Sequence, residues 1–194
     1  GSLTASSLPE KRFDSLPTER DNPATRDFDR LTPLEILDRM NGEDARIHEA
    51  LHAARVPLAR AVKLTVNRLR RGGRIFFVGA GTSGRLGILE AAECPPTFDT
   101  PPDLVQAVMA GGPECVWASR EGAEDDAPAG KAALRKKRVR ARDVVVGISA
   151  SGITPFVHGA LRHAGSLRAG RILVTCNRKG VAASSADVIV ATPV

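Results

Sequence analysis

Two segments of the chain place glycines and hydroxyl side chains directly after a short apolar run. Residues 74–85 read RIFFVGAGTSGR, and residues 143–154 read DVVVGISASGIT. A buried strand that turns into a helix through such a loop presents backbone N–H groups and hydroxyls, which suit an oxyanion and most often a phosphate. Loops that follow parallel strands converge at the carboxyl ends of one sheet, where open α/β folds hold their ligands. The sequence therefore predicts a site for a small phosphorylated molecule.

The first loop also satisfies the G-x-G-x-x-G pattern through Gly79, Gly81 and Gly84. A dinucleotide site is not favoured, because no acidic residue ends a second strand about 20 residues later. A P-loop is excluded, because no Gly-Lys-Ser/Thr follows. A tight turn without a ligand also explains glycines, but it does not require this many hydroxyls. The hydroxyls that favour phosphate binding are those of Thr82, Ser83, Ser149, Ser151 and Thr154.

Carboxylates form the second group of candidate residues. Glu93 lies near the end of the helix that the first loop opens, and Pro95 and Pro96 are predicted to stop that helix. Glu121 and Glu124 lie in an acidic, glycine-containing connection. Crowded carboxylates raise one another's pKa, which suits general acid or base catalysis near neutral pH. From the charge pattern alone, a solvated acidic loop is the favoured interpretation and catalysis the alternative.

The composition excludes several other classes of site. His48 and His52 share a helix face but lack a third ligand, so no metal site is predicted. The basic run at residues 135–142 has no interleaved aromatic residues, and we interpret it as a solvated helix end rather than a nucleic-acid site. No apolar run approaches the roughly 18 residues that a membrane helix needs. No partnership with nucleic acid or membrane is therefore expected.

The cysteines and the N-terminal residues give an indication of the cellular compartment. Cys94, Cys115 and Cys176 are odd in number and show no metal-type spacing, which does not support a disulfide framework. The chain opens on GSLT without a basic region followed by an apolar one, so no signal peptide is predicted. These features favour a reducing, cytoplasmic location.

The N-terminal third is predicted to be an arm followed by helices. Residues 1–30 are polar and interpreted as extended or partly disordered, whereas residues 31–194 form the folded domain. Thr32 is predicted to cap a short helix that stops at residues 41–42. A longer amphipathic helix follows to about residue 69, with a break or kink at Pro57.

From residue 74 onward, short β-branched runs alternate with helical patterns. This alternation predicts a three-layer α/β/α sandwich, flavodoxin-like or Rossmann-like, with a five-stranded parallel sheet. Strands are expected at 74–79, 104–109, 143–148, 171–176 and 187–191. Helices are expected at 84–92, 114–121, 128–138, 154–164 and 179–184.

The sequence resembles sugar isomerase (SIS) domains, and more narrowly the N-acetylmuramic acid 6-phosphate etherases and the related glucokinase regulatory protein. The two hydroxyl loops alone indicate only the broad domain class. The segments Glu-Cys-Pro-Pro-Thr and Glu-Gly-Ala-Glu-Asp, which follow Gly-Ala-Gly-Thr-Ser-Gly-Arg, are more specific. The matching segments are 18–25, 31–37, 79–89, 93–97, 121–125 and 146–152.

The resemblance implies a lyase that needs no cofactor and acts on N-acetylmuramic acid 6-phosphate. Products would be N-acetylglucosamine 6-phosphate and D-lactate, as in the recycling of cell-wall amino sugars. By analogy, Glu93 is the acid that protonates the leaving lactate, and Glu124 removes the C2 proton. The resemblance also implies a homodimer. The implied phosphate-binding residues are Gly81, Thr82, Ser83, Gly84, Arg85, Ser149, Ser151, Gly152 and Thr154.

Members of that family continue well past the position of Val194, so we interpret the chain as either truncated at its C-terminus or a shortened natural relative. Two other functions share this fold. One is a non-catalytic sugar-phosphate sensor of the glucokinase-regulator type, or an inactive fragment. The other is a sugar-phosphate isomerase, which does not explain the Glu-Cys-Pro-Pro-Thr segment.

Overall fold

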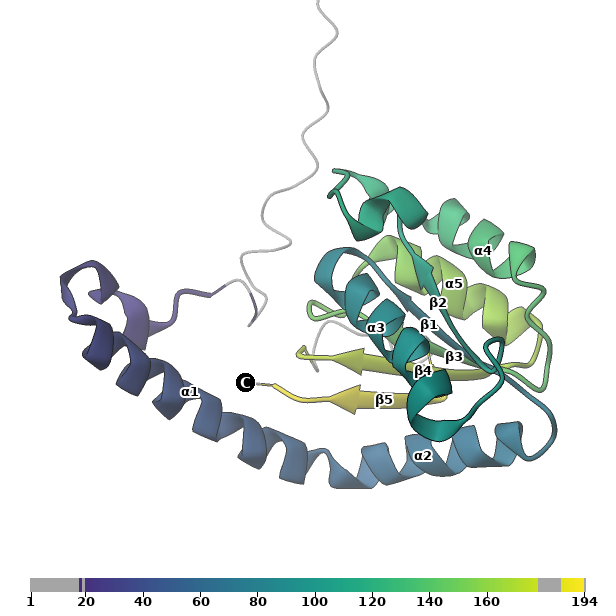
Figure 1. The fold of residues 1–194 in the computed structure, drawn as a ribbon, viewed down its shortest axis with the longest axis horizontal. Coiled ribbons are helices and arrows are strands. Elements are labelled where there is room, and N and C mark those ends of the chain that lie inside the picture. Colours follow the sequence, from purple (N-terminus) through teal and green to yellow (C-terminus); the bar gives the residue numbers. More distant parts are fainter. Residues whose placement is uncertain (1–17, 19, 178–185, 194) are drawn as a thin grey trace, which may run out of the picture.

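The computed structural model describes residue 18, residues 20–177 and residues 186–193. Its centre is a five-stranded, fully parallel sheet with the strand order β2-β1-β3-β4-β5 (Figure 1). This sheet confirms the predicted α/β class, and each strand agrees with its predicted bounds to within one residue. The strands are β1 Ile75–Gly79, β2 Val105–Met109, β3 Val144–Ile148, β4 Gly170–Thr175 and β5 Val188–Ala191.

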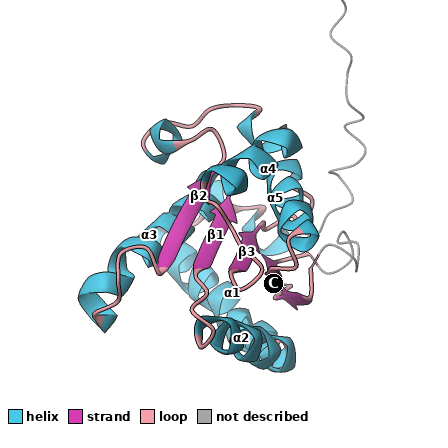
Figure 2. Ribbon diagram, turned by 90° about the vertical axis from the view of Figure 1, so that its right-hand side faces the viewer, coloured by secondary structure: helices cyan, strands magenta, loops and turns pink. Residues whose placement is uncertain are grey.

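Helices cover both faces of the sheet (Figure 2). The helices α4 (Ala127–Lys136) and α5 (Pro155–Ser166) pack on the face that carries Phe76 and Val78 of β1. The opposite face carries Phe77, against which α2 (Arg55–Leu69) and α3 (Gly81–Phe98) lie. Because both faces are buried, the strands are continuous apolar runs rather than alternating ones.

The first helix, α1 (Pro33–Ala53), extends beyond the sheet (Figure 1). Thr32 caps it and forms the predicted capping box with Glu35. The prediction that this helix stops at residues 41–42 is wrong, since the helix continues to Ala53. Asn and Gly at a solvated helix position cost only about 1 kcal/mol or less, which the rest of a long helix offsets.

The N-terminal segment folds back on α1. Residues Pro23–Thr25 and Phe28–Arg30 form two short 3-10 helices. The Arg39 guanidinium donates to Asp27 at 2.9 Å and to the carbonyl oxygen of Ala24 at 2.7 Å. From residue 20 onward the arm is therefore turned and hydrogen-bonded to the helix rather than extended.

The predicted break near Pro57 is present, but it lies at Ala54, where α1 ends and α2 begins. Pro57 occupies the first turn of α2. A proline is accommodated there because that N–H has no partner within the helix in any case.

The prediction that Pro95 and Pro96 stop the third helix is wrong. Both lie inside α3, which starts at Gly81 and ends at Phe98, where Asp99 adopts a left-handed conformation. Proline's fixed φ is compatible with a helix, and the missing N–H donors affect only its last turns.

One predicted helix is largely absent, and another lies outside the described residues. Where a helix was expected at 114–121, the structure has a short 3-10 helix, Pro113–Val116. Gly111 and Gly112 precede it with φ values of +78° and +84°, which lie outside the right-handed helical region. The helix expected at 179–184 lies outside the described residues.

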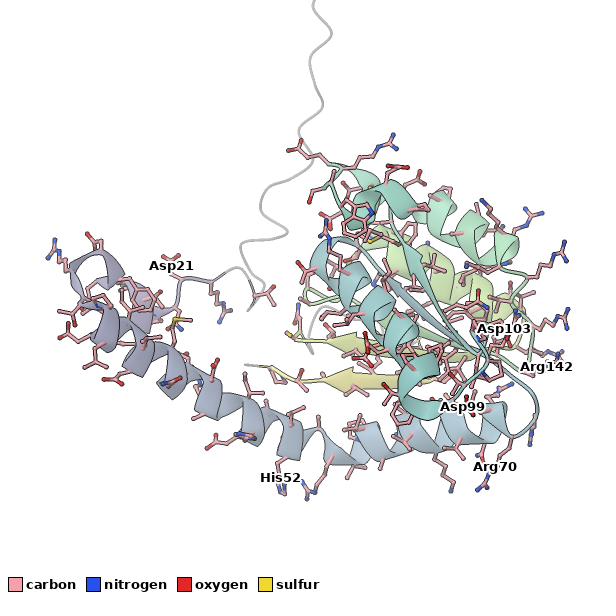
Figure 3. The ribbon with its side chains drawn as sticks, viewed as in Figure 1. Asp21, His52, Arg70, Asp99, Asp103 and Arg142 are labelled. Carbon is pink, nitrogen blue, oxygen red and sulfur yellow. The ribbon has the colours of Figure 1, made fainter. Side chains whose placement is uncertain are left out.

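The amino edge of the sheet is held by a buried carboxylate, that of Asp143. It accepts hydrogen bonds from the backbone N–H of Arg74 at 2.9 Å and of Arg140 at 2.8 Å. The Arg74 guanidinium forms an ion pair with it at 2.9 Å. Arg70, Arg142, Asp99 and Asp103 lie around the same edge (Figure 3). One carboxylate thus joins the starts of β1 and β3.

Candidate functional site

The two hydroxyl loops leave the sheet at its topological switch point. The chain runs from β1 outward to β2 on one side and to β3 on the other, so the strand order reverses between β1 and β3. Val78 of β1 pairs with Gly147 of β3, which places the ends of these strands side by side. Open α/β sheets bind ligands at this crevice. The predicted convergence of the two loops at one edge is therefore present in the backbone.

The first loop opens directly into the N-terminus of α3. Gly81 adopts a φ of +52°, and a Cβ built there meets no atom within 4 Å. Ala80 occupies the N-cap position without a side-chain cap. The first bond within the helix runs from the N–H of Gly84 to the carbonyl oxygen of Ala80 at 3.2 Å. The N–H groups of residues 81–83 precede this bond, and N–H groups in the first turn of a helix have no partner within the helix and suit an anion.

Close packing explains two other glycines of this loop. A Cβ on Gly79 would lie 2.6 Å from the backbone nitrogen of Gly84, and one on Gly84 would lie 2.8 Å from the carbonyl oxygen of Gly79. These two residues let α3 start against the end of β1. Their presence in the G-x-G-x-x-G pattern therefore needs no dinucleotide.

In the second loop the hydroxyls already contact one another. The Ser149 hydroxyl lies 2.7 Å from that of Thr154 and accepts a hydrogen bond from the N–H of Gly152 at 3.1 Å. Ser149 is buried, whereas Ser151 is half-buried and accepts from the N–H of Ile153 at 3.4 Å. Gly152 adopts a φ of +74° within this turn. The loop is a compact hydroxyl cluster at the start of α5.

A cavity of about 200 Å³ lies beside the first loop. The N-terminus of α3, the end of β2 and the connection between β2 and α4 form its wall. Its lining residues are Ala80, Gly81, Arg85, Met109, Ala110, Cys115, Ser119, Arg120, Glu121, Gly122, Ala123 and Glu124.

Arg85 joins α3 to the far wall of the cavity. Its Nε donates to the carbonyl oxygen of Val116 at 2.8 Å, and its Nη2 donates to that of Cys115 at 3.0 Å. The side chain thereby fixes the short 3-10 helix Pro113–Val116 against the first loop. Of the two sequence-based interpretations of Arg85, direct binding or bracing of the loop, these contacts support bracing.

The acidic connection reaches the same cavity. Glu124 lies on a 3-10 helix, Ala123–Asp125, which follows Gly122 at a φ of +72°. Ala123 packs against the hydrophobic core and anchors this turn. Glu121 and Glu124 are both exposed and both line the cavity. The structure thus brings Glu124, Gly81 and Arg85 together.

Glu93 lies elsewhere in the same chain. Residue 93 follows residue 81 by about 18 Å along the helix axis. Asp99, just past the end of α3, lies at the amino edge of the sheet near Arg142 (Figure 3). Glu93 is exposed and is not among the residues that line the cavity. Within one chain, Glu93 therefore lies outside the cavity that Glu124 lines.

The remaining predicted residues do not line the cavity. Thr82, Ser83 and Gly84 lie in the first turn of α3. Ser149, Ser151, Gly152 and Thr154 lie on the neighbouring loop. Sequence reasoning did not select Cys115, Ser119 or Arg120. Arg120 directly precedes the acidic segment. Only this position in the sequence could have indicated that Arg120 lies at the cavity.

The fold is that of an open, parallel α/β protein of flavodoxin-like strand order. Solved structures share this fold: a phosphoheptose isomerase from Neisseria gonorrhoeae superposes with a TM-score of 0.60 at 23% identity, covering 82% of this chain and 87% of that one. The family model of the glucokinase regulatory protein N-terminal SIS domain matches residues 57–165. The chain belongs to this SIS domain family.

Curated relatives are more similar in sequence. An N-acetylmuramic acid 6-phosphate etherase from Thermosynechococcus vestitus is 50% identical over 171 residues, which cover 88% of this chain and 56% of the relative. A protein of the same name from Rippkaea orientalis is 52% identical over 159 residues, covering 82% of this chain and 52% of the relative. The chain thus spans about half the length of these relatives.

Two observations concern other kinds of site. Within the described part of the chain, no helix combines the length and apolar character that crossing a bilayer requires. Across residues 20–177 and 186–193, no group of three His, Cys, Asp or Glu side chains is arranged to hold a metal ion.

Proposed function

We propose that this chain is the sugar-phosphate-binding part of an N-acetylmuramic acid 6-phosphate etherase. Such a lyase splits the D-lactyl ether to give N-acetylglucosamine 6-phosphate and D-lactate. The proposal is supported by about 50% identity to proteins of that name and by a cavity that places Glu124 beside the N-terminus of α3. Because the substrate is a peptidoglycan sugar, we assign the reaction to cytoplasmic amino sugar recycling.

The chemistry requires a base and an acid. In the open-chain sugar the C2 proton is α to the C1 aldehyde, so a carboxylate can remove it. The electron pair left at C2 then forms the C2–C3 double bond while the C3–O bond breaks. The lactate oxygen keeps the C3–O pair and takes a proton from a carboxylic acid. Water adds at C3 to complete the hydration. We assign the base to Glu124, which lines the cavity, and the acid to Glu93.

The phosphate is assigned to the two loops at the switch point. The backbone N–H groups at the start of α3 carry the partial positive charge of a helix N-terminus. The hydroxyls of Thr82, Ser83 and Ser151 add donors, while Ser149 and Thr154 hold the second loop in shape. The binding residues include Gly81, Gly84, Arg85 and Gly152 as parts of these turns.

A homodimer accounts for the separation of the two acids. Leu86 and Leu89, which are 51% and 54% exposed, precede Glu93 by seven and four residues and so share its face of α3. Large apolar side chains on an exposed helix face indicate an interface. We propose that a second copy covers this face, so that Glu93 acts in a site completed by two chains.

The decisive measurement is the release of D-lactate from N-acetylmuramic acid 6-phosphate. We expect release by the chain, and we expect Glu124→Gln to abolish both release and the exchange of the C2 proton with solvent deuterium, while sugar-phosphate binding is retained. Glu114→Gln is the matched control, because Glu114 is an exposed acid of the same connection that does not line the cavity.

Two results would contradict the proposal. Unimpaired deuterium exchange in the Glu124→Gln variant would remove Glu124 from the role of base. Binding of sugar phosphates without lactate release by the unaltered chain would instead favour a non-catalytic sugar-phosphate sensor.

A further inference from the structure

Two cationic side chains line the cavity, and their hydrogen bonds differ. Arg85 uses its Nε and Nη2 on the carbonyl oxygens of Val116 and Cys115. The ion pairs between described residues are Arg39–Asp27, Arg46–Glu43, Arg74–Asp143 and Arg171–Asp187. None of them involves Arg120, whose backbone carbonyl accepts a hydrogen bond from Ala123. Arg120 is thus an exposed cation at the cavity with no carboxylate partner in the described part of the chain.

In the segment that carries Arg120, the cavity is lined by acidic residues. Glu121 and Glu124 line it, and Asp125 and Asp126 follow directly in the sequence. A second anion from a ligand would be repelled here unless a cation lies beside it. A guanidinium is suited to this role because it holds a carboxylate through two parallel hydrogen bonds.

The proposed substrate carries such a second anion. Besides its 6-phosphate, the lactyl ether at C3 ends in a carboxylate, and this ether is the bond that breaks. The carboxylate must therefore lie within a few bonds of the atoms on which Glu124 acts. Between the two cations of the cavity, Arg120 has its guanidinium available, whereas that of Arg85 is engaged with backbone carbonyls.

We propose that Arg120 binds the lactyl carboxylate and so selects the carboxylate-bearing sugar phosphate over the sugar phosphate without it. This assignment rests on the proposed function. It makes Arg120 a specificity residue, distinct from the loops that hold the phosphate. As the lactate leaves, the same contact stabilises it as an anion.

The test compares two ligands, N-acetylmuramic acid 6-phosphate and N-acetylglucosamine 6-phosphate, which differ by the lactyl group. Binding is measured by titration calorimetry and by the fluorescence of Trp117, which is the chain's single tryptophan, is 90% exposed and lies three residues before Arg120. We expect Arg120→Ala to weaken binding of the muramic ligand by about 10- to 100-fold, the effect of losing a hydrogen bond to a charged group. Binding of the glucosamine ligand should remain within about twofold, an energy of roughly 0.4 kcal/mol.

Two further variants separate this contact from folding and from general electrostatics. Arg120→Lys keeps the charge without the planar fork and should restore part of the lost affinity. Arg135→Ala removes an exposed cation of α4 that does not line the cavity, and it should leave both affinities unchanged.

Each remaining outcome has a definite meaning. Equal weakening of both ligands by Arg120→Ala would assign Arg120 to the phosphate or to the fold and overturn the proposal, as would unchanged binding of both. If the unaltered chain binds both ligands and releases no lactate, the etherase assignment is contradicted while the binding test of Arg120 still stands. If the unaltered chain binds neither, both proposals are overturned.

Discussion

The two glycine- and serine-rich loops follow neighbouring strands and look alike in sequence, yet the structure builds them differently. The first has an uncapped helix N-terminus, a glycine with open space around it, and a cavity beside it. The second uses its hydroxyls on its own backbone and on each other, with Ser149 buried. Similar composition therefore forms an open, uncapped helix start in one loop and a self-supporting turn in the other.

This difference indicates separate roles for the two loops. A loop whose donors are unsatisfied gains most from a ligand, because the ligand supplies the missing partners. A loop whose donors are satisfied provides a fixed surface against which the ligand is held. Binding and stability should consequently respond to different substitutions in the two loops.

The largest expected effect is on stability, at the start of the first loop. In Gly79→Val, even the Cβ would lie only 2.6 Å from the Gly84 nitrogen. The substitution should therefore lower the free energy of unfolding by about 3 kcal/mol or more. Gly81→Ala meets no neighbour and only strains a positive φ, which costs about 1 kcal/mol. Urea denaturation measures both, and similar losses in the two variants would mean that packing does not explain Gly79.

The next effect is on affinity. Replacing Ser83 by Ala should weaken the binding of N-acetylglucosamine 6-phosphate, since one lost hydrogen bond to a charged group is worth roughly 1.5–3 kcal/mol. Titration calorimetry gives the dissociation constant. Unchanged affinity would show that the phosphate is bound elsewhere.

A smaller effect separates folding from binding in the second loop. Ser149→Ala removes a buried hydroxyl that contacts both Thr154 and Gly152, so unfolding should become easier by about 1–2 kcal/mol. The exposed Thr82 of the first loop is the control, and Thr82→Ala should change stability by less than about 0.5 kcal/mol. Comparable losses in the two variants would erase the contrast between the loops.

The smallest effect concerns the helix that the second loop begins. Burial and the cations Lys131 and Arg135 lower the pKa of His163 on α5. The folded chain then holds this proton less tightly than the unfolded chain, so stability decreases as the pH falls through the unfolded value near 6.5. His163→Gln should make this decrease shallower. Thermal unfolding measured about one pH unit above and below that value tests this. An identical pH dependence in both proteins would exclude His163 as a contributor.

Much of the fold could be predicted because its signals are local and strong. Buried, β-branched runs gave the five strands, and the Thr32 capping box gave the start of α1. The errors arose where a local signal predicted the end of a helix and the helix nevertheless continues through it. Residues 41–42 and the Pro95–Pro96 pair both lie inside helices, because a helix tolerates one weak position when its other residues favour it.

The candidate site was only partly predictable. Glu124 and Gly81 could be selected from their motifs, and the cavity contains both. Cys115 could not, because it reaches the cavity through an irregular connection that follows two glycines of positive φ. For Arg120, the position directly before the acidic segment was the only signal in the sequence. The remoteness of Glu93 depends on the direction in which α3 runs, which spacing in the sequence does not reveal.

The carboxylate of Asp143, at the opposite end of the molecule, bears on the geometry of the loops. It fixes the first residues of β1 and β3 to one point, and each of these strands has five residues. Because the two strands are paired from their first residues and have equal length, their carboxyl ends lie side by side. The contacts of Asp143, about 17 Å from the loops, therefore help to align the two loops with each other. A substitution at Asp143 should shift one loop relative to the other, although Asp143 contacts neither loop.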